Sequence, residues 1–184
     1  MEEERNYNFE SVFINSVDAK KGKLKEKTKK YISKDEALRK LQKYCAYQDR
    51  CHQEVRTKLI ELGCYGDDLE EVMAELISDN FLNEERFARS YARGKFRFKK
   101  WGRIRIRREL KMRKISAYCM KKAMEEIDET EYSETIEKLL LKKNKTLREN
   151  DLFKRRKKLA DYVIQKGFES FLVWGMIKEM NFEE

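Results

Sequence analysis

The sequence predicts an all-α protein, arranged as an elongated, curved array of three tandem three-helix repeats that are helix-turn-helix-like. The 184-residue chain has no proline and only seven glycines, so the turn signals of β-rich folds are scarce. Charged residues make up 42% of the chain, and an elongated body has the surface to carry them. Three helix–turn–helix junctions align at Leu59, Leu110 and Val163, a spacing of 51 and then 53 residues. A repeat at this spacing indicates tandem helical modules that pack on their neighbours.

The first repeat is expected over residues 33–82, after an N-terminal arm of residues 1–32. The arm passes from the acidic MEEERNYNFE to the lysine-rich KKGKLKEKTKK, which predicts disorder. Ser33 and Glu36 form a capping-box pattern that starts the first helix. A second helix ends near Gly63, which suits a left-handed cap, and Asp67 or Asp68 opens the third.

The second and third repeats are expected over residues 83–129 and 130–184. Asn83 is the predicted cap of a helix that precedes the RIRIR stretch, and Ser116 precedes a further helix. Apolar residues at helical spacing define the core-facing side of this further helix: Cys119, Met120, Ala123, Met124 and Ile127. The third repeat shows the same rhythm from Tyr132 to Met180.

The RIRIR stretch alternates like a β-strand, but only for five residues. Leu110 continues Ile106 at the i+4 position, and a single strand would have no partner in an otherwise helical chain. We therefore predict a helix here.

Several classes of protein are disfavoured. The chain has no apolar run near the roughly 20 residues that span a bilayer, and its start has no secretory apolar region. We expect a cytoplasmic monomer with no membrane contact. The spacing of Cys45, Cys51, Cys64 and Cys119 matches no disulfide or zinc framework. With one histidine and no glycine-rich phosphate loop, we expect neither an enzyme nor a bound cofactor or metal.

A block of cations fills the second repeat. Between residues 86 and 114 Glu109 is the only acid, and the block holds fourteen basic residues: Arg86, Arg89, Arg93, Lys95, Arg97, Lys99, Lys100, Arg103, Arg105, Arg107, Arg108, Lys111, Arg113 and Lys114. On a helix, Arg103, Arg107 and Lys111 form a row of like charges that repel one another. Such a row is stabilised by an anionic partner. A solvated surface is the alternative interpretation.

The candidate partner- and DNA-binding residues come from this block and from the KRRKK cluster of the third repeat. They are Arg93, Lys95, Arg97, Lys99, Lys100, Arg103, Arg105, Arg107, Arg108, Lys111, Lys154, Arg155, Arg156, Lys157 and Lys158. Because RIRIRR starts the middle helix of the second repeat and KRRKK starts that of the third, they suggest a continuous basic stripe along the array. Phe96, Phe98 and Trp101 suit base stacking, docking on an acidic protein groove, or a hydrophobic plug between repeats.

The ordered segments DRCHQEVRTKL, LNEERFARSYA, KWGRIRIRRELKMRKIS and YVIQKGFESFLVWGMI resemble the RecX family of bacterial regulatory proteins. The likeness runs from Ser33 to Met180. The family usually has Asp at Glu84, Ser at Cys51, Leu at Val55 and Gly at Lys114. The resemblance implies three tandem three-helix repeats and binding to the RecA recombinase.

The resemblance also implies a mechanism. The array would lie in the groove of a RecA filament on single-stranded DNA, oppose filament growth, and suppress ATP hydrolysis, strand exchange and co-protease activity. A helical protein that binds single- or double-stranded DNA by itself, without sequence preference, remains the alternative. Phosphate contacts alone specify no sequence.

Overall fold

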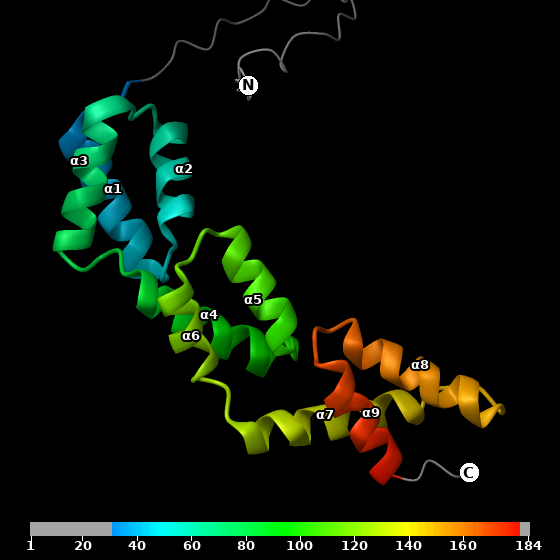
Figure 1. Ribbon diagram of the computed structural model, residues 1–184. Coiled ribbons are helices and arrows are strands. Elements are labelled where there is room, and N and C mark those ends of the chain that lie inside the picture. The colour runs from blue at the N-terminus through cyan, green and yellow to red at the C-terminus, as the bar shows by residue number, and fades with distance from the viewer. Residues whose placement is uncertain (1–30, 181–184) are drawn as a thin grey trace, which may run out of the picture.

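The computed structural model describes residues 31–180, and all regular secondary structure in this part of the chain is α-helical (Figure 1). The predicted arm lies outside the described residues except for its last two positions. The helices of the described part are α1 (Lys34–Tyr47), α2 (His52–Leu62), α3 (Gly66–Ser78), α4 (Glu84–Lys99), α5 (Arg103–Met112), α6 (Ala117–Met124), α7 (Glu129–Asn144), α8 (Leu152–Ile164) and α9 (Ser170–Glu179). They follow one another in groups of three along an elongated, bent body.

Polar caps fix where the helices begin. The side chains of Ser33, Asn83, Ser116, Asp128 and Asp151 each accept a hydrogen bond from a first-turn backbone N–H of the helix that follows. The predicted starts of the helices at Ser33, Asn83 and Ser116 are therefore confirmed. The third helix begins slightly earlier than predicted, at Gly66, so that both aspartates lie in its first turn, where they favour the helix dipole.

The RIRIR stretch is helical, as predicted, and forms the first half of α5. Ile106 and Leu110 are fully buried, while Arg107 and Arg108 are exposed. The helix therefore separates an apolar face from a basic one, which the short alternation in the sequence obscures.

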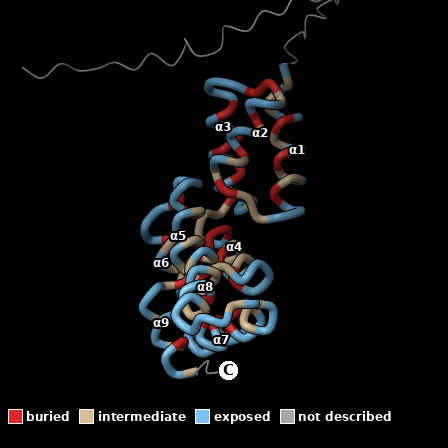
Figure 2. The backbone as a smooth tube through the Cα atoms, turned by 90° about the vertical axis from the view of Figure 1, so that its right-hand side faces the viewer, coloured by how far each residue is buried: buried red, intermediate tan, exposed pale blue. Residues whose placement is uncertain are grey.

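The buried residues form two separate cores. One core lies within the first three helices and includes Leu41, Leu59 and Leu76. The other runs without interruption through α4 to α9 (Figure 2) and also takes in Cys51, which precedes α2. The last six helices therefore share one apolar interior, whereas the first three are joined to them across a smaller contact.

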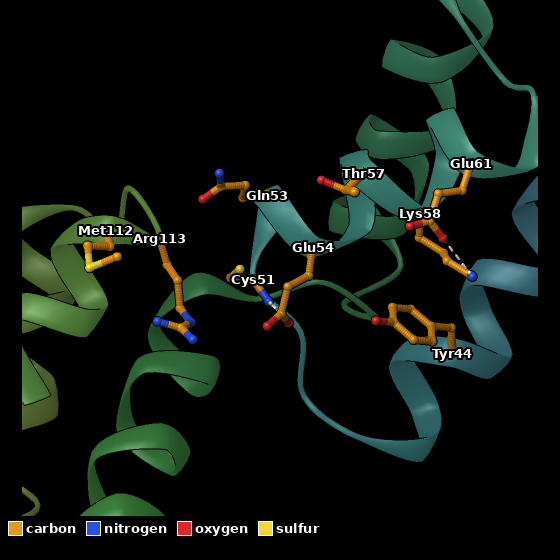
Figure 3. Close-up of a pocket in the computed structure, with 9 residues that line it drawn as sticks. All are labelled: Tyr44, Cys51, Gln53, Glu54, Thr57, Lys58, Glu61, Met112 and Arg113. Carbon is orange, nitrogen blue, oxygen red and sulfur yellow. Dashed lines mark hydrogen bonds and ion pairs between the residues drawn. The ribbon is translucent and has the colours of Figure 1, made fainter. Parts of the chain in front are cut away.

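Polar contacts join the first three helices to α4, beside the buried Cys51. Asp49, in the turn after α1, accepts hydrogen bonds from Arg86 Nε at 2.9 Å and Ser90 Oγ at 2.8 Å, both on α4. Across the hollow on another side of this joint, Arg113 lies opposite Glu54 of α2 (Figure 3). The hydrogen bonds of Asp49 therefore attach the first three helices to α4.

Two glycines bring α5 against the turn between α8 and α9. The Gly102 N–H donates to the Lys166 carbonyl at 2.9 Å, and the Ile104 N–H donates to the Gly167 carbonyl at 3.0 Å. A Cβ at Gly102 would lie under 3.0 Å from the Gly167 carbonyl oxygen. Gly102 has an ordinary extended backbone, so glycine is needed here for space alone.

A buried tyrosine completes this joint. The Tyr132 hydroxyl donates to Glu169 at 2.6 Å and accepts from the Arg103 N–H at 3.0 Å, and its ring packs on Phe96 and Phe168. Burial, reinforced by the hydrogen bond to Glu169, raises the pKa of the Tyr132 phenol above its ordinary value. The neutral phenol is thus the form that the fold stabilises.

Tyr132→Phe is expected to lower the free energy of unfolding at neutral pH by about 1–3 kcal/mol, because Glu169 and the Arg103 N–H lose their partner. The contribution of the Tyr132 hydroxyl to stability is complete below the unfolded-state pKa of a tyrosine, about 10. It is lost as pH rises above that value, because the unfolded chain then releases the phenol proton more readily than the folded one. Urea unfolding at pH 7 and at about pH 10.5 should therefore show a smaller difference between the two proteins at the higher pH. A difference independent of pH would contradict this assignment.

Corresponding turns follow α2, α5 and α8. Each turn contains one residue with a left-handed backbone: Gly63 (φ 86°), Lys114 (φ 56°) or Gly167 (φ 93°). This residue follows, by four positions, a fully buried residue of the preceding helix. Lys114 thus adopts the left-handed turn that glycine adopts elsewhere. Its neighbour donates from the Ile115 N–H to the Leu110 carbonyl at 3.1 Å, as Cys64 does to Leu59 at 3.0 Å.

Lys114→Gly is expected to raise the free energy of unfolding by about 0.5–1 kcal/mol, because a left-handed backbone is costly for a residue with a Cβ. Lys114→Ala, which keeps the Cβ, serves as the control and should change stability little. Urea midpoints of the three proteins test this. Equal gains from glycine and alanine would show that charge, rather than backbone strain, is responsible.

Candidate partner-binding surface

The fourteen cations of residues 86–114 fall into different structural classes. Six of them form ion pairs: Arg86, Arg89, Arg93, Arg97, Arg103 and Arg113. Arg93 pairs with Glu126 at 3.0 Å, and Arg97 reaches Glu131 at 3.5 Å. All six cations are neutralised within the fold, and Arg89, Arg93 and Arg97 hold α4 to the segments that follow α6.

Two candidate residues on α5 differ from the predicted exposed row. Arg103 is only 13% exposed at its side chain, pairs with Glu129 at 2.7 Å, and stacks on the Tyr132 ring at 4.1 Å. The Arg105 guanidinium carbon lies 4.1 Å from the centroid of the Trp101 ring, and the Arg105 Cβ lies close to Gly167. Both side chains therefore belong to the joint with the last three helices, and only Arg107 and Lys111 of the row face solvent.

A set of exposed cations remains. We call it the open basic set: Lys99, Lys100, Arg107, Arg108, Lys111 and Lys114. Within the described residues none of these forms an ion pair or a hydrogen bond through its side chain, whereas Lys95 lies over the rings of Tyr91 and Trp101. Charges left without acids on the same surface attract an anionic partner most strongly.

The KRRKK cluster on α8 is more fully satisfied. Lys154 and Lys158 pair with Asp151 and Glu149, and Arg155 donates to Asn144 at 2.9 Å. Arg156 is half-buried. Lys157 is exposed and has no side-chain partner among residues 31–180. The cluster therefore contributes less open charge than its sequence suggests.

The predicted stripe along the middle helices does not extend over the whole array. The helices α2, α5 and α8 lie along one side of the body in the view of Figure 1. On α2, however, Arg56 pairs with Glu70 and Lys58 with Glu61. Open positive charge is thus concentrated on α5 and the end of α4.

The aromatic residues of KFRFKKW separate into distinct roles. Phe96 is buried and packs on Tyr132, so it belongs to the hydrophobic core. Trp101 is half-buried beneath Arg105. Phe98 is 85% exposed and adjoins Lys99 and Lys100, so it is available to a partner.

A groove between α5 and α6 was missed by sequence reasoning. It has a volume of about 490 Å³ and is lined by Arg107, Arg108, Lys111, Ala117, Met120, Lys121 and Met124. Met120 and Met124 were predicted to be core residues, but both are only half-buried. The signal for the groove was a cation, Lys121, between two methionines on one helical turn.

The cysteines of the described chain are buried and free. Burial raises the pKa of all four cysteine thiols above the ordinary value, which favours the protonated form. Residues 31–180 contain no cluster of three potential metal ligands among His, Cys, Asp and Glu, and no helix long and apolar enough to cross a bilayer.

The fold and surface define an elongated helical-repeat protein whose open charge suits binding to an anionic macromolecule. A solved "regulatory protein RecX" superposes with a TM-score of 0.72 at 24% identity over 79% of this chain and 73% of that one. RecX from Lactobacillus salivarius superposes with a TM-score of 0.69 at 21% identity, over 82% and 97% of the two chains. These structures share the fold.

Sequence comparison identifies the family. Models of the second and third three-helix domains of RecX match residues 83–124 and 129–175. Regulatory protein RecX of Prosthecochloris aestuarii is 28% identical over 78% of this chain and 93% of its own length. Regulatory protein RecX of Clostridium perfringens is 30% identical over 74% of this chain and 62% of its own length. The chain spans about half the length (52%) of regulatory protein RecX of Bacillus cytotoxicus. The chain belongs to the RecX family of regulatory proteins.

Proposed function

We propose that this chain binds the RecA recombinase filament on single-stranded DNA and inhibits it, acting as a monomer in the bacterial cytoplasm. The observation that carries the proposal is the open basic set, an exposed group of cations with no acids to neutralise it. Membership of the RecX family supplies the partner, by the resemblance described above.

The shape and charge of the chain fit this role. An elongated bent body (Figure 1) can follow a helical groove, and the core shared by α4 to α9 supports the helix that carries most of the open basic set. Binding that favours one filament state shifts the population toward that state, so inhibition of extension, ATP hydrolysis, strand exchange and co-protease activity needs no chemistry by this chain.

The test is single-strand-DNA-dependent ATP hydrolysis by RecA from the same organism, titrated with this protein. We expect inhibition at ratios well below one molecule per RecA. Raising the DNA concentration at constant RecA serves as the control. Inhibition that appears only when this protein is abundant enough to coat the DNA, and that extra DNA relieves, would support the alternative of a DNA-binding protein acting by itself.

A further inference from the structure

The groove between α5 and α6 combines an apolar floor with a cationic rim. Its floor is formed by Met120, Met124 and Ala117, and its rim carries Arg107, Arg108, Lys111 and Lys121. All four cations are exposed, and none has an ion-pair partner in residues 31–180. We propose that this groove binds an acidic segment of the protein partner that inserts an apolar side chain between the methionines.

The floor distinguishes a protein ligand from nucleic acid. Phosphates need only the cations, and they gain nothing from two thioether side chains. Bases bind best by stacking on aromatic rings, but no Phe, Tyr or Trp lines this groove among the described residues. Methionine side chains are flexible and polarisable, and they suit surfaces that receive varied apolar side chains.

The carboxylates near the groove do not neutralise its rim. A neighbouring hollow shares Arg107, Lys121 and Met124 and also contains Glu125, Asp128, Glu129 and Glu169. Each of these acids is already engaged. Glu125 pairs with Lys122, Glu129 with Arg103, Glu169 accepts from Tyr132, and Asp128 caps α7. None of these four acids forms an ion pair with Arg107 or Lys121, so the cations of the rim stay available to an anionic ligand.

The inference rests on the proposed function, because the filament supplies the segment. It assigns the α5–α6 groove to protein and leaves Lys99, Lys100 and Lys157 for nucleic acid. The ligand chemistry follows from the groove: an aliphatic or aromatic side chain with carboxylates beside it.

The double variant Met120→Gln, Met124→Gln tests the groove in the full chain. We expect binding to RecA filaments to weaken about tenfold, while affinity for bare single-stranded DNA stays unchanged. Met112→Gln is the matched control, since Met112 is an exposed methionine outside the groove. Unchanged filament affinity in the double variant would overturn the inference. Failure of the wild-type protein to bind filaments would overturn the proposed function itself.

Photo-crosslinking gives an independent measurement that does not depend on the stability of the double variant. Benzoylphenylalanine placed at Met120 should crosslink, in RecA filaments, to a peptide that carries acidic and apolar residues, identified by mass spectrometry. A crosslink to DNA, to a basic peptide, or to nothing in filaments that the protein demonstrably binds would overturn the assignment.

Discussion

Gly102→Ala is expected to lower the free energy of unfolding by about 3 kcal/mol. The new methyl group would overlap the backbone of Gly167, and the overlap cannot be relieved by rotating a flexible side chain. The two hydrogen bonds from Gly102 and Ile104 to residues 166 and 167 would lengthen or break. The joint between α5 and the α8–α9 turn would therefore open, and with it part of the shared core. Urea unfolding followed by circular dichroism measures the change.

Gly94→Ala is the matched control for this prediction. Gly94 lies within α4, and a Cβ added there meets no atom within 4 Å. Alanine at an unobstructed helical position is expected to raise stability by about 0.5–1 kcal/mol. If the two alanine variants changed stability equally, the close approach of Gly102 to Gly167 would not hold the repeats together.

Neutralising the three residues of the open basic set that lie on α5 is expected to have the largest effect on binding. In Arg107→Gln, Arg108→Gln, Lys111→Gln, affinity for the filament should fall about tenfold or more, because these charges have no partners within the fold. The dependence of binding on salt should also flatten, since salt screens the attraction between these exposed charges and an acidic partner. Fluorescence anisotropy at several salt concentrations measures both quantities.

The control removes the same number of positive charges from residues that are ion-paired. Arg93, Arg97 and Lys138 pair with Glu126, Glu131 and Glu134, and all three cations are exposed. Exposed pairs contribute only about 0–1 kcal/mol to stability, so the glutamine variants should fold. Equal losses of affinity in both triple variants would show that net charge, and not the position of the open basic set, controls binding.

Local signals in the sequence were sufficient to predict where the helices lie. The caps at Ser33 and Asn83, the left-handed turn at Gly63 and the i+4 spacing of Ile106 and Leu110 all depend on neighbouring residues. Such signals act within one or two helical turns, so a single sequence reveals them. The proposed division into repeats followed from the same local patterns.

Long-range contacts explain what the sequence could not predict. Arg93 pairs with an acid 33 residues away, and Arg89 meets the same acid across 37 residues. A run of cations in the sequence gives no sign of which ones the fold will neutralise. Arg103 was predicted to be open but is fixed beside Tyr132. Gly102 and Gly167 likewise acquire their importance only when two distant turns meet.

The most direct test of the central proposal compares the affinity of the wild-type protein for preassembled RecA filaments with its affinity for the same single-stranded DNA without RecA. At near-physiological salt, roughly 0.15 M, screening weakens contacts to phosphate alone. We predict that the filament is bound about tenfold or more tightly than the bare DNA. Equal affinities would contradict the account and identify the chain as a protein that binds DNA without needing the recombinase.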